Sequence, residues 1–255
     1  HLPSPTITGS VKSDVALINE VVGVKVAISD HRSSEPTTNE LAKLASEARV
    51  GGMLGDKPGL VHLHVGGDSK GLSPITDVLK DSEIPPNQFL PTHVARDSEL
   101  LEEALEFVRI GGNIDITCPG DSANFAEEVE EISTRLKATD VPLRNVTFST
   151  DGNGSLPRFN DEGNLIGLGQ GTVTTLHETF VELVKNNGFE IPEALNLVTA
   201  NPARRLGIYD QKGSIEAGKD ADLLVLSDDL EIEKVFARGA LMVDQGSALV
   251  KGSFE

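Results

Sequence analysis

Residues 21–29 read VVGVKVAIS, a short apolar run that contains one charged side chain, Lys25. Four more short apolar runs follow along the chain, at Leu60–Val65, Phe89–Val94, Asn113–Cys118 and Asn145–Thr150. Brief runs rich in Val, Ile and Leu are typical of strands in a parallel sheet whose two faces are both covered. We therefore expect five parallel strands in the first 150 residues.

Amphipathic helical patterns separate and follow these runs. Thr37 and Glu40 have the spacing of a capping box and predict a helix toward Val50. Ser98–Ile110 places its leucines and Val108 on one face and its glutamates on the other, and Phe125–Thr139 and Thr172–Asn187 show the same period. Strand and helix in alternation predict βα units around a parallel sheet.

Five βα units are too few to close an eight-stranded barrel. The chain also opens on His1-Leu2-Pro3, without a methionine or a signal-peptide pattern, so we expect an internal start. The fold class that we predict is α/β: the C-terminal five βα units of a (β/α)8 TIM-like barrel, plus part of a small β-sandwich domain. The barrel part is expected to span residues 1–205.

The pattern changes after Pro202. Glycine and aspartate separate short apolar stretches at Leu223–Leu226, Ile232–Ala237 and Leu241–Val243, which predicts a small β-domain over residues 206–255. The longest unpatterned stretch, Gly152–Gly171, carries six glycines, and loops of that length are usually lids or disordered.

Composition excludes several classes of function. Acidic residues outnumber basic ones by 40 to 22, giving a net charge of -18, so we expect no nucleic-acid partner, because phosphate backbones require a basic face. No stretch approaches the roughly 20 apolar residues that cross a bilayer, so no membrane partner is expected either. One cysteine, Cys118, permits no internal disulfide and favours a reducing, cytoplasmic setting.

Four ionisable residues lie in or just beyond predicted strands: Lys25, His64, His93 and Asp151. Taken singly, a histidine at a strand end is more often structural, Lys25 could extend to solvent, and Asp151 before a glycine could be a turn residue. However, an unpaired ammonium buried inside an apolar strand is costly. Because barrel active sites form at the carboxyl ends of the strands, the four together predict a metal site.

The residues around these four resemble the isoaspartyl dipeptidases of the amidohydrolase superfamily over nearly the whole chain. The resemblance rests on Gly23-Val24-Lys25, Ser29-Asp30-His31-Arg32-Ser33, His64-Val65-Gly66-Gly67-Asp68-Ser69, Pro91-Thr92-His93-Val94-Ala95-Arg96, Ser149-Thr150-Asp151-Gly152-Asn153-Gly154-Ser155 and the less specific Gly218–Leu223. It implies two divalent metal ions, expected to be Zn2+, bridged by carboxylated Lys25 and bound by His64, His93 and Asp151.

The same resemblance implies hydrolysis of the β-aspartyl bond by a metal-bridging hydroxide, with Asp151 as the proton shuttle. It also assigns Arg32, Arg96 and Ser155 to substrate binding. Arginines without a metal site would be read as solvated surface residues, but beside one they suit bidentate capture of carboxylates. The expected partner is a small dipeptide substrate with free carboxylates, and the protein is expected to be a homo-oligomer.

One part of the family pattern is missing, because its His-x-His pair from the first barrel strand should lie upstream of His1. His62 and His64 form a His-x-His, but they follow the lysine strand, so we interpret His62 as a histidine of the barrel interior. His31 and His177 are expected to be structural. Three alternatives remain open: an N-acyl-D-amino-acid deacylase, a hydantoinase or dihydropyrimidinase, and a metal-free scaffold without activity.

Overall fold

The computed structural model describes residues 6–31, 33–120, 124–159 and 165–252. Its central feature is a parallel sheet in which the strands lie in chain order, β1 to β5. The strands are β1 (Gly23–Ile28), β2 (Leu60–Val65), β3 (Phe89–Thr92), β4 (Ile114–Thr117) and β5 (Val146–Ser149). Each strand lies within the apolar run that predicted it, so the expected number and order of strands are confirmed.

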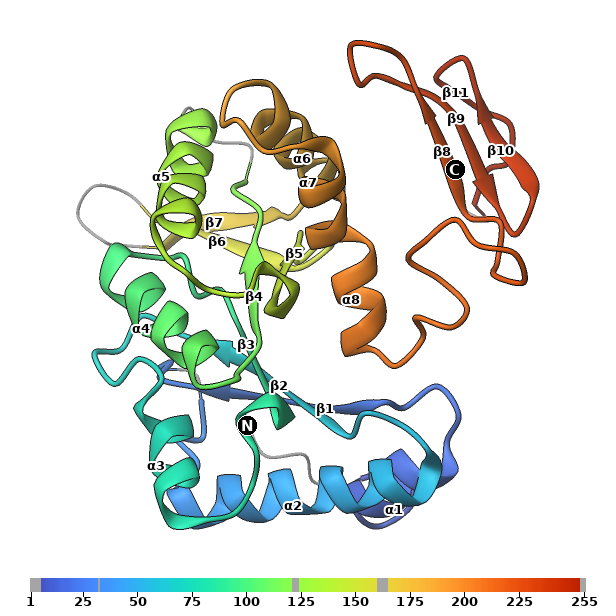
Figure 1. Ribbon diagram of the computed structural model, residues 1–255. Coiled ribbons are helices and arrows are strands. Elements are labelled where there is room, and N and C mark those ends of the chain that lie inside the picture. Colours follow the sequence, from blue (N-terminus) through green and yellow to red (C-terminus); the bar gives the residue numbers. More distant parts are fainter. Residues whose placement is uncertain (1–5, 32, 121–123, 160–164, 253–255) are drawn as a thin grey trace.

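Helices follow the strands and lie in an arc around the outer side of the sheet (Figure 1). They are α1 (Val11–Leu17), α2 (Thr38–Gly55), α3 (Ser73–Asp81), α4 (Ser98–Arg109), α5 (Phe125–Ala138), α6 (Thr175–Lys185), α7 (Ile191–Val198) and α8 (Ala200–Arg205), with short 3-10 turns η1 (Pro86–Gln88) and η2 (Leu143–Asn145). The predicted capping box is present: the Thr37 side chain accepts from the Glu40 backbone, and the Glu40 carboxylate accepts from the Thr37 backbone.

The two faces of the sheet differ in what they contact. Val61, Leu63 and Val65 of β2 are fully buried and belong to the hydrophobic core that the helices complete. His62 and His64, which alternate with them, lie on the inner face and are only half-buried. This is the arrangement of consecutive βα units in a (β/α)8 barrel, with the helices outside and the polar side chains inside.

The stretch Gly152–Gly171 differs from the expectation of an unpatterned loop. It contains two antiparallel strands, β6 (Ser155–Phe159) and β7 (Leu165–Gln170). At the base of this ribbon the Asn153 amide donates to the Gly171 carbonyl, and the Gly171 amide donates to the Gly154 carbonyl. These bonds use backbone atoms only, so they can form in a glycine-rich sequence. Such a sequence lacks the alternation of side chains from which strands are predicted.

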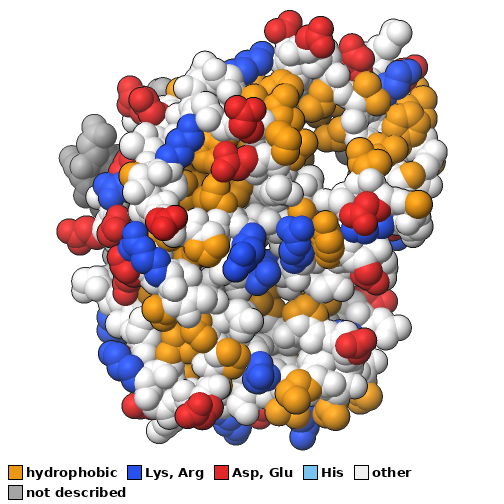
Figure 2. All heavy atoms as spheres, in the orientation of Figure 1, with side chains coloured by type: hydrophobic (Ala, Val, Ile, Leu, Met, Phe, Trp, Pro, Cys, Tyr) orange, Lys and Arg blue, Asp and Glu red, His pale blue; other side chains and the backbone are white. Residues whose placement is uncertain are grey.

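A second sheet lies apart from the first and is joined to it through α8 and residues 206–222 (Figure 1). It is antiparallel, in the order β11-β10-β9-β8, and consists of β8 (Leu223–Leu226), β9 (Ile232–Ala237), β10 (Ala240–Asp244) and β11 (Ser247–Ala248). Hydrophobic side chains reach the surface over this sheet in Figure 2, and Leu224 and Val225 are exposed. The three predicted C-terminal strands are thus confirmed.

Helix α6 contacts the connection between β8 and β9. His177 Nε2 lies 2.8 Å from the carbonyl oxygen of Leu230, a residue of that connection. His177 is therefore a structural residue, as the sequence predicts. Among the described residues, none of the helices combines the length and the apolar character that a membrane crossing would require.

Candidate active site

Three of the four predicted site residues converge at the carboxyl ends of the parallel strands. His64 lies in β2, His93 directly follows β3, and Asp151 lies two residues beyond β5. The imidazole rings of His64 and His93 pack edge to face, with centroids 4.6 Å apart. His93 Nε2 lies 4.0 Å from Asp151 Oδ2. The fold therefore brings two imidazoles and a carboxylate together, although His64 and Asp151 are 87 residues apart in the sequence.

The ring of His64 is oriented by a carboxylate. His64 Nε2 lies 2.8 Å from Oδ2 of Asp30, and Asp30 is 5% exposed at the second position after β1. A buried carboxylate that contacts one ring nitrogen fixes the orientation of the imidazole and raises its basicity. Asp30 is a residue to which sequence reasoning assigned no role.

The ring of His93 is held by the next strand. Its Nδ1 lies 2.6 Å from Oγ1 of Thr117 in β4, while its buried Nε2 has no hydrogen-bond partner among the described residues. Burial, followed by the positive charge of Arg96, lowers the pKa of His93 to about 3. The imidazole is therefore neutral near neutral pH and can offer a lone pair to a metal ion.

Lys25 differs from the sequence expectation. It was expected to be buried within an apolar strand, but its side chain is exposed. In the sheet that this chain forms, β1 lies at the end, and Lys25 has a paired neighbour on one side. That neighbour is His62, directly opposite Lys25 in the β1–β2 register.

Lys25 nevertheless belongs to the electrostatic environment of the histidines. Its charge contributes to the lowered pKa of His93, and it also helps to lower the pKa of His62, for which burial is the largest cause. Asp115 opposes that shift at His62. His62 lies on the same face of β2 as His64, and its Nε2 is buried without a hydrogen-bond partner in the described part of the chain.

Of the three predicted substrate-binding residues, the structure describes the side chain of Arg96. Arg96 is exposed, and its Nε donates to the carbonyl oxygen of Val65, 3.1 Å away at the end of β2. This bond directs the base of the guanidinium toward the strand ends where the histidines lie. Arg32 lies outside the described residues, and so does the side chain of Ser155, whose backbone begins β6.

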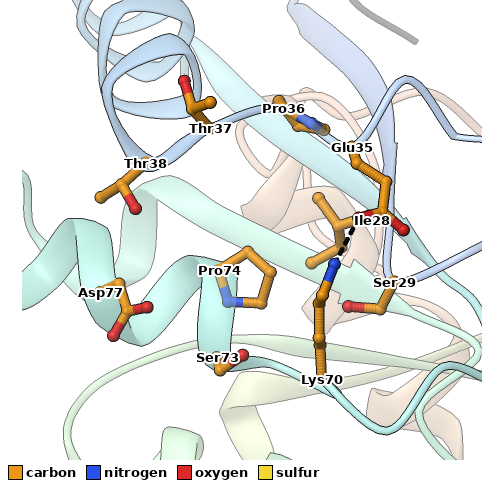
Figure 3. A pocket seen from close by; sticks show the side chains of 10 residues that line it. All are labelled: Ile28, Ser29, Glu35, Pro36, Thr37, Thr38, Lys70, Ser73, Pro74 and Asp77. Carbon is orange, nitrogen blue, oxygen red and sulfur yellow. Dashed lines mark hydrogen bonds and ion pairs between the residues drawn. The ribbon is translucent and has the colours of Figure 1, made fainter.

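A cavity of about 390 Å³ lies beside the end of β1 and the first turns of α2 and α3. Lys70 and Glu35 form an ion pair across it (Figure 3). It is lined by Ile28, Ser29, Glu35, Pro36, Thr37, Thr38, Lys70, Ser73, Pro74 and Asp77. Because none of the converging histidines or Asp151 lines this cavity, the candidate site is a separate place on the inner face of the sheet.

Comparison with known families decides what kind of protein carries this site. The sequence pattern described as "Amidohydrolase family" matches residues 12–242 of the 255. The chain belongs to the amidohydrolase family. This membership agrees with the five βα units, with the inward-facing histidines and with the resemblance noted in the sequence.

Solved structures narrow the comparison. A β-aspartyl dipeptidase from Fervidobacterium islandicum AW-1, in complex with the β-Asp-Leu dipeptide, superimposes with a TM-score of 0.87 at 36% identity, covering 97% of this chain and 65% of that one. A second structure of a β-aspartyl dipeptidase from the same organism gives a TM-score of 0.82 at 34% identity, with 97% and 63% covered. This amidohydrolase chain thus spans about two thirds of the length of those proteins.

Other relatives share the fold or a short segment. A D-hydantoinase from a Thermus species has a TM-score of 0.59 at 13% identity, with 91% of this chain and 66% of that chain covered, and shows the fold alone. An imidazolonepropionase from Thermoplasma acidophilum is 57% identical over 44 residues, which cover 17% of this chain and 11% of the relative. These matches leave the substrate to be argued from the site.

The residues of this amidohydrolase site fit a divalent metal in their chemistry. Two imidazoles and a carboxylate are a donor set that suits zinc, and the buried Nε2 of His93 lacks a hydrogen-bond partner among the described residues. Within the described ranges no three His, Cys, Asp or Glu side chains form a complete ligand group.

Proposed function

We propose that the protein carrying this chain hydrolyses the β-aspartyl peptide bond of isoaspartyl dipeptides. The observation that carries the proposal is the 36% identity to a β-aspartyl dipeptidase, bound to β-Asp-Leu, over 97% of this chain. The convergence of His64, His93 and Asp151 at the strand ends supports a hydrolytic site. Retention of these side chains speaks against the alternative of a scaffold without activity.

The proposed cofactor is a pair of divalent ions, with zinc as the expected metal. His64 and His93 would hold one ion, Asp151 would contact the other, and Lys25, carboxylated on Nζ, would bridge the two. Asp30, 2.8 Å from Nε2 of His64, would hold this ring in place. Divalent ions in such a site polarise the scissile carbonyl and lower the pKa of a bound water to about 7.

Carboxylation of Lys25 would reverse the charge of its side chain. The carbamate carries a negative charge. His93 and His62 would then have an anionic neighbour in place of the cationic Lys25, which now contributes to lowering the pKa of both.

Asp151 carries the proton chemistry in this proposal. The oxygen of a water molecule forms a bond to the β-carboxamide carbon, Asp151 accepts the proton that the water loses, and the carbon–nitrogen bond breaks. Asp151 then returns the proton to the leaving amine, so that one carboxylate acts first as general base and then as general acid. Its half-exposed side chain, 37% accessible, allows this exchange.

Arg96 and Arg32 are proposed to bind the substrate carboxylates, with Ser155 as an additional contact. An isoaspartyl dipeptide carries one carboxylate on the β-linked aspartate and one at its C-terminus. Planar guanidinium groups bind carboxylates through two parallel hydrogen bonds. A hydantoin ring has no second anionic group, so two arginines that follow β1 and β3 in the sequence favour the dipeptide over the hydantoinase alternative.

The decisive experiment compares substrates on the full-length protein with measured metal content. We expect turnover of β-Asp-Leu and little or no turnover of α-Asp-Leu, N-acetyl-D-leucine or hydantoin. Preference for the acylated amino acid or the hydantoin would replace the dipeptidase proposal with the corresponding alternative. A protein without bound metal and without turnover of any of the four would support the scaffold.

The remaining proposals concern the setting of the enzyme. The single, buried Cys118 suits a reducing cytoplasm, where structural disulfides are rare. We also propose a homo-oligomer, and a division into a barrel domain at residues 1–205 and a small β-domain at residues 206–255. Sedimentation of the full-length protein and limited proteolysis between the two sheets test these two statements.

A further inference from the structure

Strand β4 supplies none of the proposed metal ligands, yet two of its side chains contact the strands that do. We propose that Thr117 and Asp115 of β4 are positioning residues: Thr117 sets the tautomer and orientation of His93, and Asp115 ties together the strand ends that carry His93 and Asp151. The inference rests on the proposed role of His93 as a metal ligand, and it does not depend on which amide is hydrolysed.

The contact between Thr117 and His93 decides which ring nitrogen can bind a metal. The 2.6 Å separation of Thr117 Oγ1 from Nδ1 is that of a hydrogen bond. In a neutral imidazole one nitrogen carries the proton and the other carries the lone pair. If Nδ1–H donates to Thr117, the lone pair lies on Nε2, the buried atom that faces Asp151 at 4.0 Å.

The backbone of His93 makes this side-chain contact more important. His93 has a φ of 65°, in the left-handed region that non-glycine residues rarely adopt. Strained residues of this kind persist only where the surrounding structure holds them. The hydrogen bond to Thr117 is a side-chain contact that holds the ring itself, so it fixes the direction in which Nε2 points.

Asp115, two residues before Thr117 in β4, contacts the same region. Its carboxylate is 4% exposed and accepts three hydroxyl hydrogen bonds: from Thr92 at 2.6 Å, from Thr147 at 2.7 Å and from Ser149 at 2.6 Å. Thr92 belongs to β3 and directly precedes His93. Ser149 ends β5, two residues before Asp151. One carboxylate therefore bonds to the segments that lead into both site residues.

Backbone pairing alone holds β3 and β4 together weakly. β3 and β4 are paired at a single position, Thr92 opposite Asp115, whereas β4 and β5 are paired at four. The bond from Thr92 to Asp115 therefore supplements the sparse ladder at the place where His93 leaves the sheet. Loss of the carboxylate should let the ends of β3 and β5 shift relative to each other.

The first test measures zinc affinity by chelator competition, a readout that does not depend on substrate. In the full-length protein Thr117→Val, which keeps the shape and removes the hydroxyl, should bind zinc about 10-fold to 100-fold more weakly, the usual loss for a second contact of a ligating histidine. Thr117→Ser keeps the hydroxyl and should stay within about threefold of wild type. Wild-type zinc affinity in Thr117→Val would overturn the role of Thr117.

A matched control separates positioning from general stability. Ser133 in α5 is 2% exposed, and its hydroxyl bonds to Asn187 at 2.8 Å, away from the site. Ser133→Ala should lower the melting temperature and leave zinc affinity unchanged. If Ser133→Ala weakened zinc binding as much as Thr117→Val, the effect would be one of stability and the inference would fail.

The second test addresses Asp115 through Asp115→Asn, because Asp115→Ala leaves a cavity and could prevent folding. The amide replaces one acceptor oxygen with an NH2 donor, so at least one of the three hydroxyls loses its acceptor: Thr147 if the amide oxygen takes the Oδ2 position, or Thr92 and Ser149 if it takes the Oδ1 position. At temperatures well below its melting point, the variant should show a kcat reduced at least tenfold with little change in KM. A purely structural Asp115 predicts a lower melting temperature with wild-type kcat, and that result would refute the positioning role.

The outcomes distinguish this inference from the proposed function. Weaker zinc binding in Thr117→Val, in a protein that does not hydrolyse β-aspartyl dipeptides, would support the positioning residues and refute the substrate; kcat would then be measured on whichever substrate is turned over. Normal dipeptide hydrolysis by the wild type, with unchanged zinc affinity in Thr117→Val and unchanged kcat in Asp115→Asn, would refute the positioning residues and leave the function standing.

Discussion

Replacement of Asp151 by asparagine is the sharpest test of the proton chemistry, because the structure makes it a clean perturbation. Asparagine has the same size and shape as aspartate. Asp151 has a φ of 48°, a left-handed conformation that asparagine tolerates as well as aspartate does. The hydrogen bond from the Gly154 amide to the carbonyl of Asp151 uses backbone atoms only and persists in the variant.

The expected magnitudes follow from the environment of the side chain. Because Asp151 is 37% exposed, the unfolding free energy should change by no more than about 0.5 kcal/mol, as for other surface substitutions. An amide cannot accept the proton of the attacking water. A positioned acid–base group contributes about 100-fold to 10,000-fold in rate, equivalent to about 3 to 5 kcal/mol in the activation barrier.

The assay is release of leucine from β-Asp-Leu by full-length protein at saturating substrate. Metal content is measured in parallel, because Asp151 is also a proposed ligand. Asp210→Asn, an exposed aspartate outside the site, is the matched control and should behave as wild type. If Asp151→Asn retains its metals and a turnover within about tenfold of wild type, a barrier change near 1.4 kcal/mol, then Asp151 does not shuttle the proton.

Three further predictions follow from other residues. Lys25→Ala should lose tight binding of the metal pair, since a methyl group cannot form a carbamate; two metals per chain and normal turnover in this variant would exclude Lys25 as the bridge. Arg96→Ala should keep its metal content and lose about 10-fold to 200-fold in kcat/KM for β-Asp-Leu, equivalent to about 1.5–3 kcal/mol for a charge-assisted contact, and Arg96→Lys should recover only part of it; full efficiency in both variants would favour the deacylase or hydantoinase alternatives. Burial raises the pKa of the Cys118 thiol to about 11 from an ordinary 9.0, so the folded state retains a proton that the unfolded state loses between pH 9 and 11. Stability from this group is therefore complete below pH 9 and falls by about 2–3 kcal/mol as the pH rises to 11; urea titrations of wild type and Cys118→Ala should diverge over that window, and parallel curves would contradict the shift.

Local sequence patterns predicted the elements well where the pattern was strong. The runs around β1 to β5 and the capping box of Thr37 and Glu40 correspond to observed elements. Helices α1, α3, α7 and α8 were not predicted, since they have seven, nine, eight and six residues, too few to establish a clear period. The β6–β7 ribbon was missed because its glycines interrupt the alternation that marks a strand.

The candidate site was predicted in part. His64, His93 and Asp151 were identified from their positions at strand ends, and the structure brings them together. Lys25 is exposed in this chain, in which β1 lies at the end of the sheet, so its role as a ligand stays a prediction. Asp30 and Thr117, which hold the two histidines, carry no local signal, since their partners are 34 and 24 residues away.

The sequence by itself determined which segments become strands and helices, and which ionisable side chains lie at strand ends. It could do so because both depend on the period of apolar residues within a few turns of chain. Only the tertiary structure decided that Asp30 contacts Nε2 of His64 while Thr117 contacts Nδ1 of His93. That difference depends on the strand register and on the left-handed backbone of His93. Neither of these is specified by residues that are neighbours in the chain.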